Sequence, residues 1–215
     1  MNENIFEAQY DVTKKTKIKK FYESYKILIY TILLLLIIFS FYFIYYLNSK
    51  ENKIIQISEN YIEARVQIEK GQENEATNIL RSIIFANNKT YSTLSFFLIL
   101  NQNLITDRQE ISILFNHLLN NNQYENELKN LIIYKKALFD SNFLNEKEIL
   151  EELKPILNSD SVWKAHALLL LGNYFLSKGE NLKAKEFYTQ ILNIQNLQDY
   201  FYNQAIRQLS SISND

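Results

Sequence analysis

The sequence predicts an all-α protein, with one N-terminal membrane-spanning helix followed by a stack of helical hairpins. Its 215 residues include only 3 Gly and 1 Pro, too few turn-forming residues for a many-stranded β fold. After position 48, apolar residues recur at helical spacing, and no period-two pattern of useful length interrupts them. A long uncharged segment near the N-terminus predicts the membrane helix.

The segment from Ile27 to Leu47 carries no charged residue and consists mainly of Leu, Ile, Phe and Tyr. As a helix it spans about 30 Å, the thickness of the hydrocarbon core of a bilayer. Tyr residues gather near both of its ends, as is typical of membrane–water interfaces. We therefore predict a transmembrane helix at 27–47. It has no ionisable group that would mark a transport path.

Lysines are distributed unequally around this span. Those before it are Lys14, Lys15, Lys17, Lys19, Lys20 and Lys26, whereas only Lys50 and Lys53 follow it closely. Because positive charge stays in the cytoplasm, we expect residues 1–26 to form a cytoplasmic basic tail, mobile over 1–13, and residues 48–215 to be exported. A cleavable signal peptide is the alternative, but the apolar run is long and no small-x-small cleavage site follows it. Lipid binding is a second interpretation of the basic tail.

The spacing of apolar residues in the exported part predicts four helical hairpins and one closing helix. The expected segments are about 48–70, 73–86, 90–103, 107–120, 123–140, 145–157, 161–177, 180–194 and 198–211. Gly71 and Gly179 each follow a Lys and suit the left-handed position that ends a helix. Thr106 and Ser161 suit N-caps, and Pro155 is expected to kink or stop its helix.

The stretch from Ala165 to Asn196 resembles a tetratricopeptide repeat, in which small and large residues at fixed positions let two helices interlock. The matching packing positions are Leu168, Leu171, Gly172, Phe175, Ala184, Tyr188 and Ile191. A weaker copy has Ala64, Gly71, Ala76, Leu80 and Ile83 at corresponding places. The number of residues that separates Ala76 from Ala184 in the sequence is not a whole multiple of the roughly 34-residue repeat. We therefore expect stacked hairpins and not a regular superhelix.

The layout over about residues 20–210 is similar to the YfgM family of ancillary Sec-translocon subunits. The similarity consists of the tail, the anchor, the KGQENEA hairpin, the segment TYSTLSFFLIL and a better repeat opened by Trp163. It implies a periplasmic protein-interaction module of the bacterial inner membrane, an accessory subunit or chaperone-recruiting factor at the translocon. The implied partners are translocon subunits and a membrane-anchored chaperone.

The residues give no support for an enzyme, a metal or a cofactor. Cys is absent, His117 and His166 lie far apart, and neither a Gly-rich phosphate loop nor a GxSxG motif occurs. A net charge of -1 disfavours nucleic acid as a partner. We expect His117 to be a partly buried packing residue, Glu151 and Glu152 to be solvated, and Lys147 to pair weakly with Glu151. An enzyme with an unrecognised helical site remains the rival hypothesis.

The resemblance also implies a partner groove. First-helix positions that line the groove of tetratricopeptide units correspond to His166, Leu169, Asn173, Leu176 and Ser177. No Lys or Arg occupies these positions, which favours extended or helical apolar segments over acidic peptide termini. One alternative is that the closing helix covers Leu169 and Leu176.

Two alternative functions compete with a role at the translocon. One is a scaffold for cell division, cytochrome maturation or outer-membrane biogenesis. The other is a subunit that only stabilises a neighbouring membrane protein through its anchor.

Overall fold

The computed structural model describes residues 4–213, with side chains from Lys19 to Ser213. Within this range the protein is all-α and consists of nine helices. The chain divides into two compact units, residues 1–56 and residues 57–215. The fold class predicted from the sequence is therefore confirmed.

Helix α1 (Asn4–Glu69) contains the uncharged segment 27–47. From Lys19 onward it is long and apolar enough to cross a membrane, and its most apolar window is not buried. A helix of this kind near the N-terminus is a candidate membrane anchor or signal sequence. Residues 4–13, which we expected to be a mobile tail, are helical. Residues 1–3 and the side chains of residues 4–18, which include three of the tail lysines, lie outside the described part.

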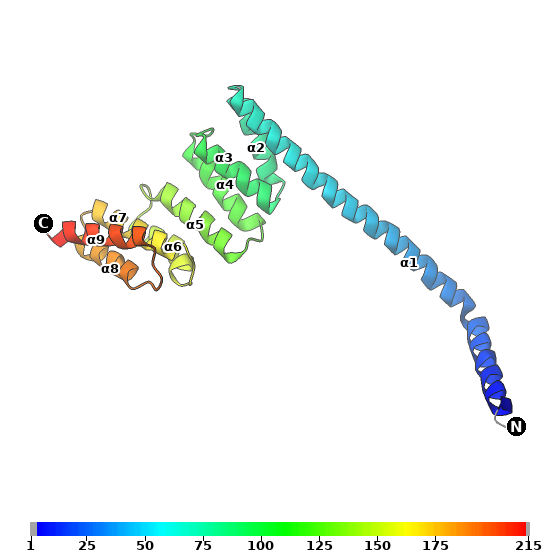
Figure 1. Ribbon diagram of the computed structural model, residues 1–215. Helices are drawn as coiled ribbons and strands as arrows, with labels where there is room; N and C mark the ends of the chain where they lie inside the picture. Colours follow the sequence, from blue (N-terminus) through cyan, green and yellow to red (C-terminus); the bar gives the residue numbers. More distant parts are fainter. Residues whose placement is uncertain (1–3, 214–215) are drawn as a thin grey trace. The chain divides into compact units, whose positions relative to one another are not determined.

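Eight helices follow α1 and pack in chain order, each against the next (Figure 1). They are α2 (Glu73–Phe85), α3 (Lys89–Asn101), α4 (Arg108–Asn121), α5 (Asn126–Asp140), α6 (Glu146–Leu157), α7 (Lys164–Ser177), α8 (Asn181–Leu192) and α9 (Asp199–Ser213). Their ends differ from the predicted ones by a few residues. The predicted series of hairpins with a closing helix is thus confirmed.

Two hydrophobic clusters form the core and meet at α5. The N-terminal cluster runs from the end of α1 to Ile132 in α5, with Phe96 and Phe115 among its fully buried residues. The C-terminal cluster begins with Ile133 and Ala137 in α5 and extends to α9. Neighbouring residues on a helix point about 100° apart, so Ile132 and Ile133 face different clusters. Helix α5 therefore joins the two halves of the packed unit.

Several helices end in a left-handed residue. Gly71 and Gly179 both have φ 75°, and in each case the next residue donates its N–H, at 2.9 Å, to the carbonyl five residues earlier. This is the Schellman pattern expected at these two glycines. Asn103, with φ 52°, ends α3 in the same way. Asn thus takes the role of Gly at this helix end, which was not predicted from the sequence.

The helix starts differ slightly from the prediction. The cap of α4 is Asp107 and not Thr106, because the Asp107 carboxylate accepts the N–H two residues on at 2.9 Å. Helix α7 begins three residues after Ser161, whose hydroxyl accepts the N–H of Trp163 at 3.2 Å. Pro155 lies inside α6, two residues before that helix ends, in agreement with its expected role as a stop.

Candidate functional site

The five residues predicted to line a groove all lie on α7, in different environments. Half-buried are His166, Leu169 and Leu176. Exposed are Asn173 and Ser177. The two leucines pack against the C-terminal core cluster, to which α9 contributes Phe201 and Ala205. Asn173 and Ser177 are thus the members that a partner can reach directly.

His166 is surrounded by aromatic rings from α5, from α9 and from the residue that precedes α7. The centroid of its ring lies 5.4 Å from that of Tyr134 in α5, 4.8 Å from that of Trp163 and 4.5 Å from that of Phe201 in α9. The rings of Tyr134 and Trp163 stack at 5.8 Å. Helix α7 also contacts both α5 and α9 directly. We call these four residues the aromatic cluster, and it links the first helices of the last two hairpins to the closing helix.

The surroundings of His166 favour its neutral form. Burial lowers the pKa of His166 below its ordinary value of 6.5, a backbone interaction with Val162 opposes this shift, and the ammonium of Lys135 lowers the pKa further. A neutral imidazole packs among aromatic rings without the desolvation cost of a charge. His166 is therefore an uncharged member of the cluster at neutral pH.

The residues predicted to pack the C-terminal repeat are all buried in one cluster. They are Leu168, Leu171, Gly172, Phe175, Ala184, Tyr188 and Ile191. A Cβ added at Gly172 would clash with the Tyr188 ring. The hydroxyl of Tyr188 donates to Oδ1 of Asn173 at 2.8 Å, and burial raises the pKa of Tyr188 to about 12. The missing side chain at Gly172 therefore makes room for this ring between α7 and α8.

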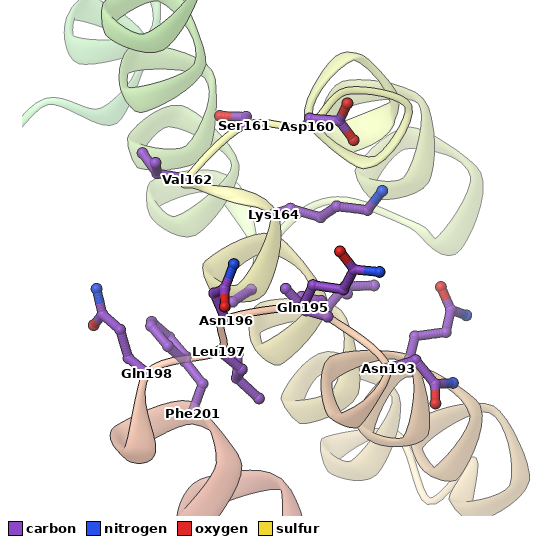
Figure 2. A pocket seen from close by; sticks show the side chains of 14 residues that line it. Asp160, Ser161, Val162, Lys164, Asn193, Gln195, Asn196, Leu197, Gln198 and Phe201 are labelled. Carbon is purple, nitrogen blue, oxygen red and sulfur yellow. The ribbon is translucent and has the colours of Figure 1, made fainter.

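A cavity of about 610 Å³ lies at the N-terminal end of α7. Its walls include residues 160–162, which lie between α6 and α7, and residues 193–198, which connect α8 to α9 (Figure 2). Its lining includes Leu168 and Phe201, so Phe201 belongs both to the cavity and to the aromatic cluster. This cavity was not predicted, because two connecting segments distant in the chain contribute to it and neither contains a recognisable motif.

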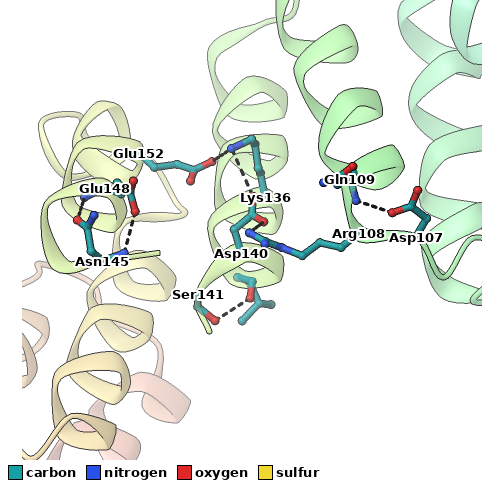
Figure 3. A network of polar contacts seen from close by, with 10 residues as sticks. Asp107, Arg108, Gln109, Lys136, Asp140, Ser141, Asn145, Glu148 and Glu152 are labelled. Atoms are coloured by element: carbon teal, nitrogen blue, oxygen red, sulfur yellow. Dashed lines mark hydrogen bonds and ion pairs between the residues drawn. The ribbon is translucent and has the colours of Figure 1, made fainter. Parts of the chain in front are cut away.

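Four charged side chains link α4, α5 and α6 (Figure 3). The carboxylate of Asp140, 4% exposed, has one oxygen 3.1 Å from Nη2 of Arg108 and the other 3.5 Å from Nζ of Lys136. The same Nζ lies 2.5 Å from Oε1 of Glu152, whose side chain is 14% exposed. The expectation that Glu152 is solvated was therefore wrong. A single sequence shows which residues are charged but not which of them meet after folding.

The remaining candidates are structural. Glu151 pairs with Lys154 at 3.1 Å and not with Lys147 as expected. His117 is half-buried, and its ring lies 4.6 Å from that of Phe85, as expected for a packing residue. Among the described residues, no three His, Asp or Glu side chains are grouped so that they could hold a metal ion.

Comparisons with known proteins give no match: no protein family, no curated protein and no solved structure matches the chain. The resemblances to tetratricopeptide repeats and to the YfgM family therefore depend on the sequence positions alone. What the structure adds is a long apolar helix near the N-terminus and a series of packed helices.

Proposed function

We propose that the protein is a single-span protein of the bacterial inner membrane whose periplasmic helical domain is a non-enzymatic protein-interaction module. One observation carries this proposal: a helix able to cross a membrane and a series of eight packed helices occur in the same chain. The lysine distribution supports a cytoplasmic tail at 1–26, a span at 27–47 and a periplasmic domain at 48–215. Helical stacks offer extended surfaces that suit protein partners.

The proposed role is that of an accessory subunit or chaperone-recruiting factor at the Sec translocon. The similarity to the YfgM family supports it. The mechanism is tethering, because anchoring in the membrane raises the effective concentration of a neighbouring partner to about the mM range. Weak contacts then suffice for recruitment. The partners are translocon subunits and a periplasmic chaperone, with lipid contacting residues 27–47 and with no nucleic acid or cofactor.

The proposed contact surface is the exposed part of α7. Asn173 and Ser177 provide polar groups there, and the half-buried Leu169 and Leu176 provide apolar surface. Leu169, Asn173 and Ser177 are spaced by about one helical turn, and Leu176 is the neighbour of Ser177. An extended or helical apolar segment fits such a surface, since apolar side chains gain from burial and the amide and hydroxyl fix orientation.

A second function remains in competition. A scaffold for cell division, cytochrome maturation or outer-membrane biogenesis would use the same anchor and the same helical surface. The partner alone distinguishes this function from a role at the translocon, so the test must identify the partner.

Photocrosslinking in intact cells provides that test. A photoreactive amino acid replaces Asn173 or Ser177 in the full-length chain, and Lys185, exposed on α8, serves as the control position. Recovery of translocon subunits and a membrane-anchored chaperone from positions 173 and 177, but not from 185, would support the proposal. Recovery of division or outer-membrane assembly proteins would favour the scaffold, and equal recovery from all three positions would refute the assigned surface.

A further inference from the structure

We propose that the cavity at the N-terminal end of α7 binds an uncharged, extended polypeptide segment and takes up one of its apolar side chains. This inference deepens the proposed interaction function and rests on it, because it names the chemistry of a partner segment. The cavity is distinct from the α7 surface described above: none of the five predicted groove residues belongs to its lining.

The rim of the cavity is rich in free carboxamide groups. These side chains are Gln190, Asn193, Gln195, Asn196 and Gln198, and all five are exposed. Each offers two N–H donors and a carbonyl acceptor, and none of the five side chains forms a hydrogen bond with another residue in the described part of the chain. An extended backbone, whose N–H and C=O groups all need partners, complements such a mixed set of donors and acceptors.

The inner wall is aliphatic. It is formed by Ala165, Leu168, Ile194 and Leu197, and Val162 lies at its outer edge. The side chain of Val162 is 70% exposed, so a bound apolar side chain would remove from water a surface that folding leaves uncovered. The volume of about 610 Å³ is within the range of small-ligand sites. It admits a side chain together with the backbone on either side of it.

The aromatic lining argues against a glycan. Phe201 is the aromatic residue of the lining and is only 4% exposed. Its ring packs edge-on against His166 at 4.5 Å and against Tyr200 at 5.1 Å. A sugar ring binds well when its C–H face stacks on an open aromatic face, and the Phe201 ring is already covered. The aliphatic wall therefore favours a peptide.

The charges of the lining favour an uncharged ligand. Its ionisable residues are Asp160, in the segment that precedes α7, and Lys164, the first residue of α7, one of each sign. A phosphate, a nucleic acid or a peptide carboxylate would gain from Lys164 but would be repelled by Asp160. A neutral segment avoids this repulsion.

The chain contains its own reporter for this site. Trp163 is the only Trp and lies between the lining residues Val162 and Lys164. Its ring packs on His166, which in turn contacts Phe201 of the cavity. Filling the cavity is therefore expected to change the fluorescence of Trp163.

The test is a fluorescence titration of the full-length chain in detergent micelles. The probe is the capped peptide acetyl-Thr-Ser-Leu-Ser-Thr-amide, and we expect saturation with a midpoint below about 1 mM. The same peptide with N-methylated backbone amides, or with Asp in place of Leu, should bind at least about tenfold more weakly. Cellotetraose, a neutral glycan, should give no saturable change.

Two matched variants locate the binding site. Val162→Asp places a charge at the cavity wall and should weaken binding of the Leu peptide at least about tenfold. Leu182→Asp is the control, because Leu182 is 82% exposed on α8 and does not line the cavity. It should leave the midpoint within about twofold of the unchanged chain. Unchanged far-UV circular dichroism in both variants shows that each chain remains folded.

Several results would overturn the inference: no saturation with the Leu peptide up to about 10 mM, equal binding of the N-methylated peptide, equal effects of the two Asp variants, or saturation with cellotetraose instead. Peptide binding to the purified chain does not depend on where the protein is anchored. The titration can thus fail while crosslinking in cells succeeds, or the reverse, so failure of this inference is distinguishable from failure of the proposed function.

Discussion

Gly172 determines how closely the Tyr188 ring approaches α7. The ring lies where a Cβ of residue 172 would be, and its hydroxyl donates to the neighbouring Asn173. Replacing Gly172 with Ala should therefore overpack the contact and lower the free energy of unfolding by about 1–3 kcal/mol. Urea unfolding of the full-length chain in detergent measures this change. Ser177→Ala, on the exposed face of the same helix, is the control, with an expected effect below about 0.5 kcal/mol.

A double-mutant cycle tests the cause. Tyr188→Leu removes the ring that the new methyl group would meet, so Gly172→Ala should cost less in that background than in the unchanged chain. If the two effects are simply additive, the Tyr188 ring is not the reason for glycine at position 172.

Asp140 is the second residue whose contribution to stability can be tested, because its buried carboxylate forms ion pairs. It is buried between Arg108 and Lys136, so its truncation removes the carboxylate that pairs with Arg108 and one of the two carboxylates that pair with Lys136. We expect Asp140→Ala to lower the free energy of unfolding by about 3 kcal/mol. Glu151→Ala removes a carboxylate from an exposed pair and should cost less than about 1 kcal/mol. Equal losses in the two variants would contradict a special role for Asp140.

At the scale of the helices, features set by local sequence were predicted better than contacts between residues that are distant in the chain. Helical spacing located all the packed helices, and Gly71 and Gly179 marked two of their ends. Asn103 was missed because Asn also occurs at caps, in loops and on surfaces, so its presence does not define an end. The cavity and the Asp140 network were missed for another reason. Both bring together residues from different helices, and a single sequence does not show such pairs.

The left-handed end of α3 gives a prediction about a helix terminus. Asn103 has φ 52°, a conformation that costs most residues about 1–2 kcal/mol and costs Gly almost nothing. Asn103→Ala should therefore lower the free energy of unfolding by about 1 kcal/mol, whereas Asn103→Gly should leave it unchanged or raise it slightly. Urea unfolding compares the two variants. A larger loss with Gly than with Ala would show that the Asn side chain, and not the backbone angle, is required.

The contact of α5, α7 and α9 at the aromatic cluster gives a pH prediction. The pKa of His166 is lowered in the folded chain, so below pH 6.5 the unfolded chain binds more protons and the free energy of unfolding falls. We expect urea midpoints to decrease from pH 7.5 to pH 5 by more than in the variant His166→Phe, which cannot titrate. The variant His117→Gln should keep the decrease. If His166→Phe shows the same pH dependence, another group is responsible.

For the whole molecule, the decisive property is its orientation in a membrane. The apolar stretch of helix α1 lies near the N-terminus, as the apolar part of a cleaved signal sequence also does. The lysine distribution and the lack of a cleavage site after Leu47 favour an uncleaved anchor. We expect a phosphatase reporter fused after Asp215 to be active outside the cytoplasm. N-terminal sequencing of the membrane-bound protein should find the chain intact.

Changing the charges around the span tests whether they cause this orientation. Replacing the six lysines before the span with Gln and adding Lys residues at Asn48 and Ser49 reverses the difference in positive charge. Short flanking segments follow the positive-inside rule, so the reporter of this variant should lose most of its activity outside the cytoplasm. A variant with Gln at Lys147 and Lys154, far from the span, keeps the charge difference and should keep the orientation. An N-terminus that begins near residue 49 in the unchanged protein would show that α1 is a signal sequence, and tethering would then fail as a mechanism because nothing would hold the helical domain at the membrane.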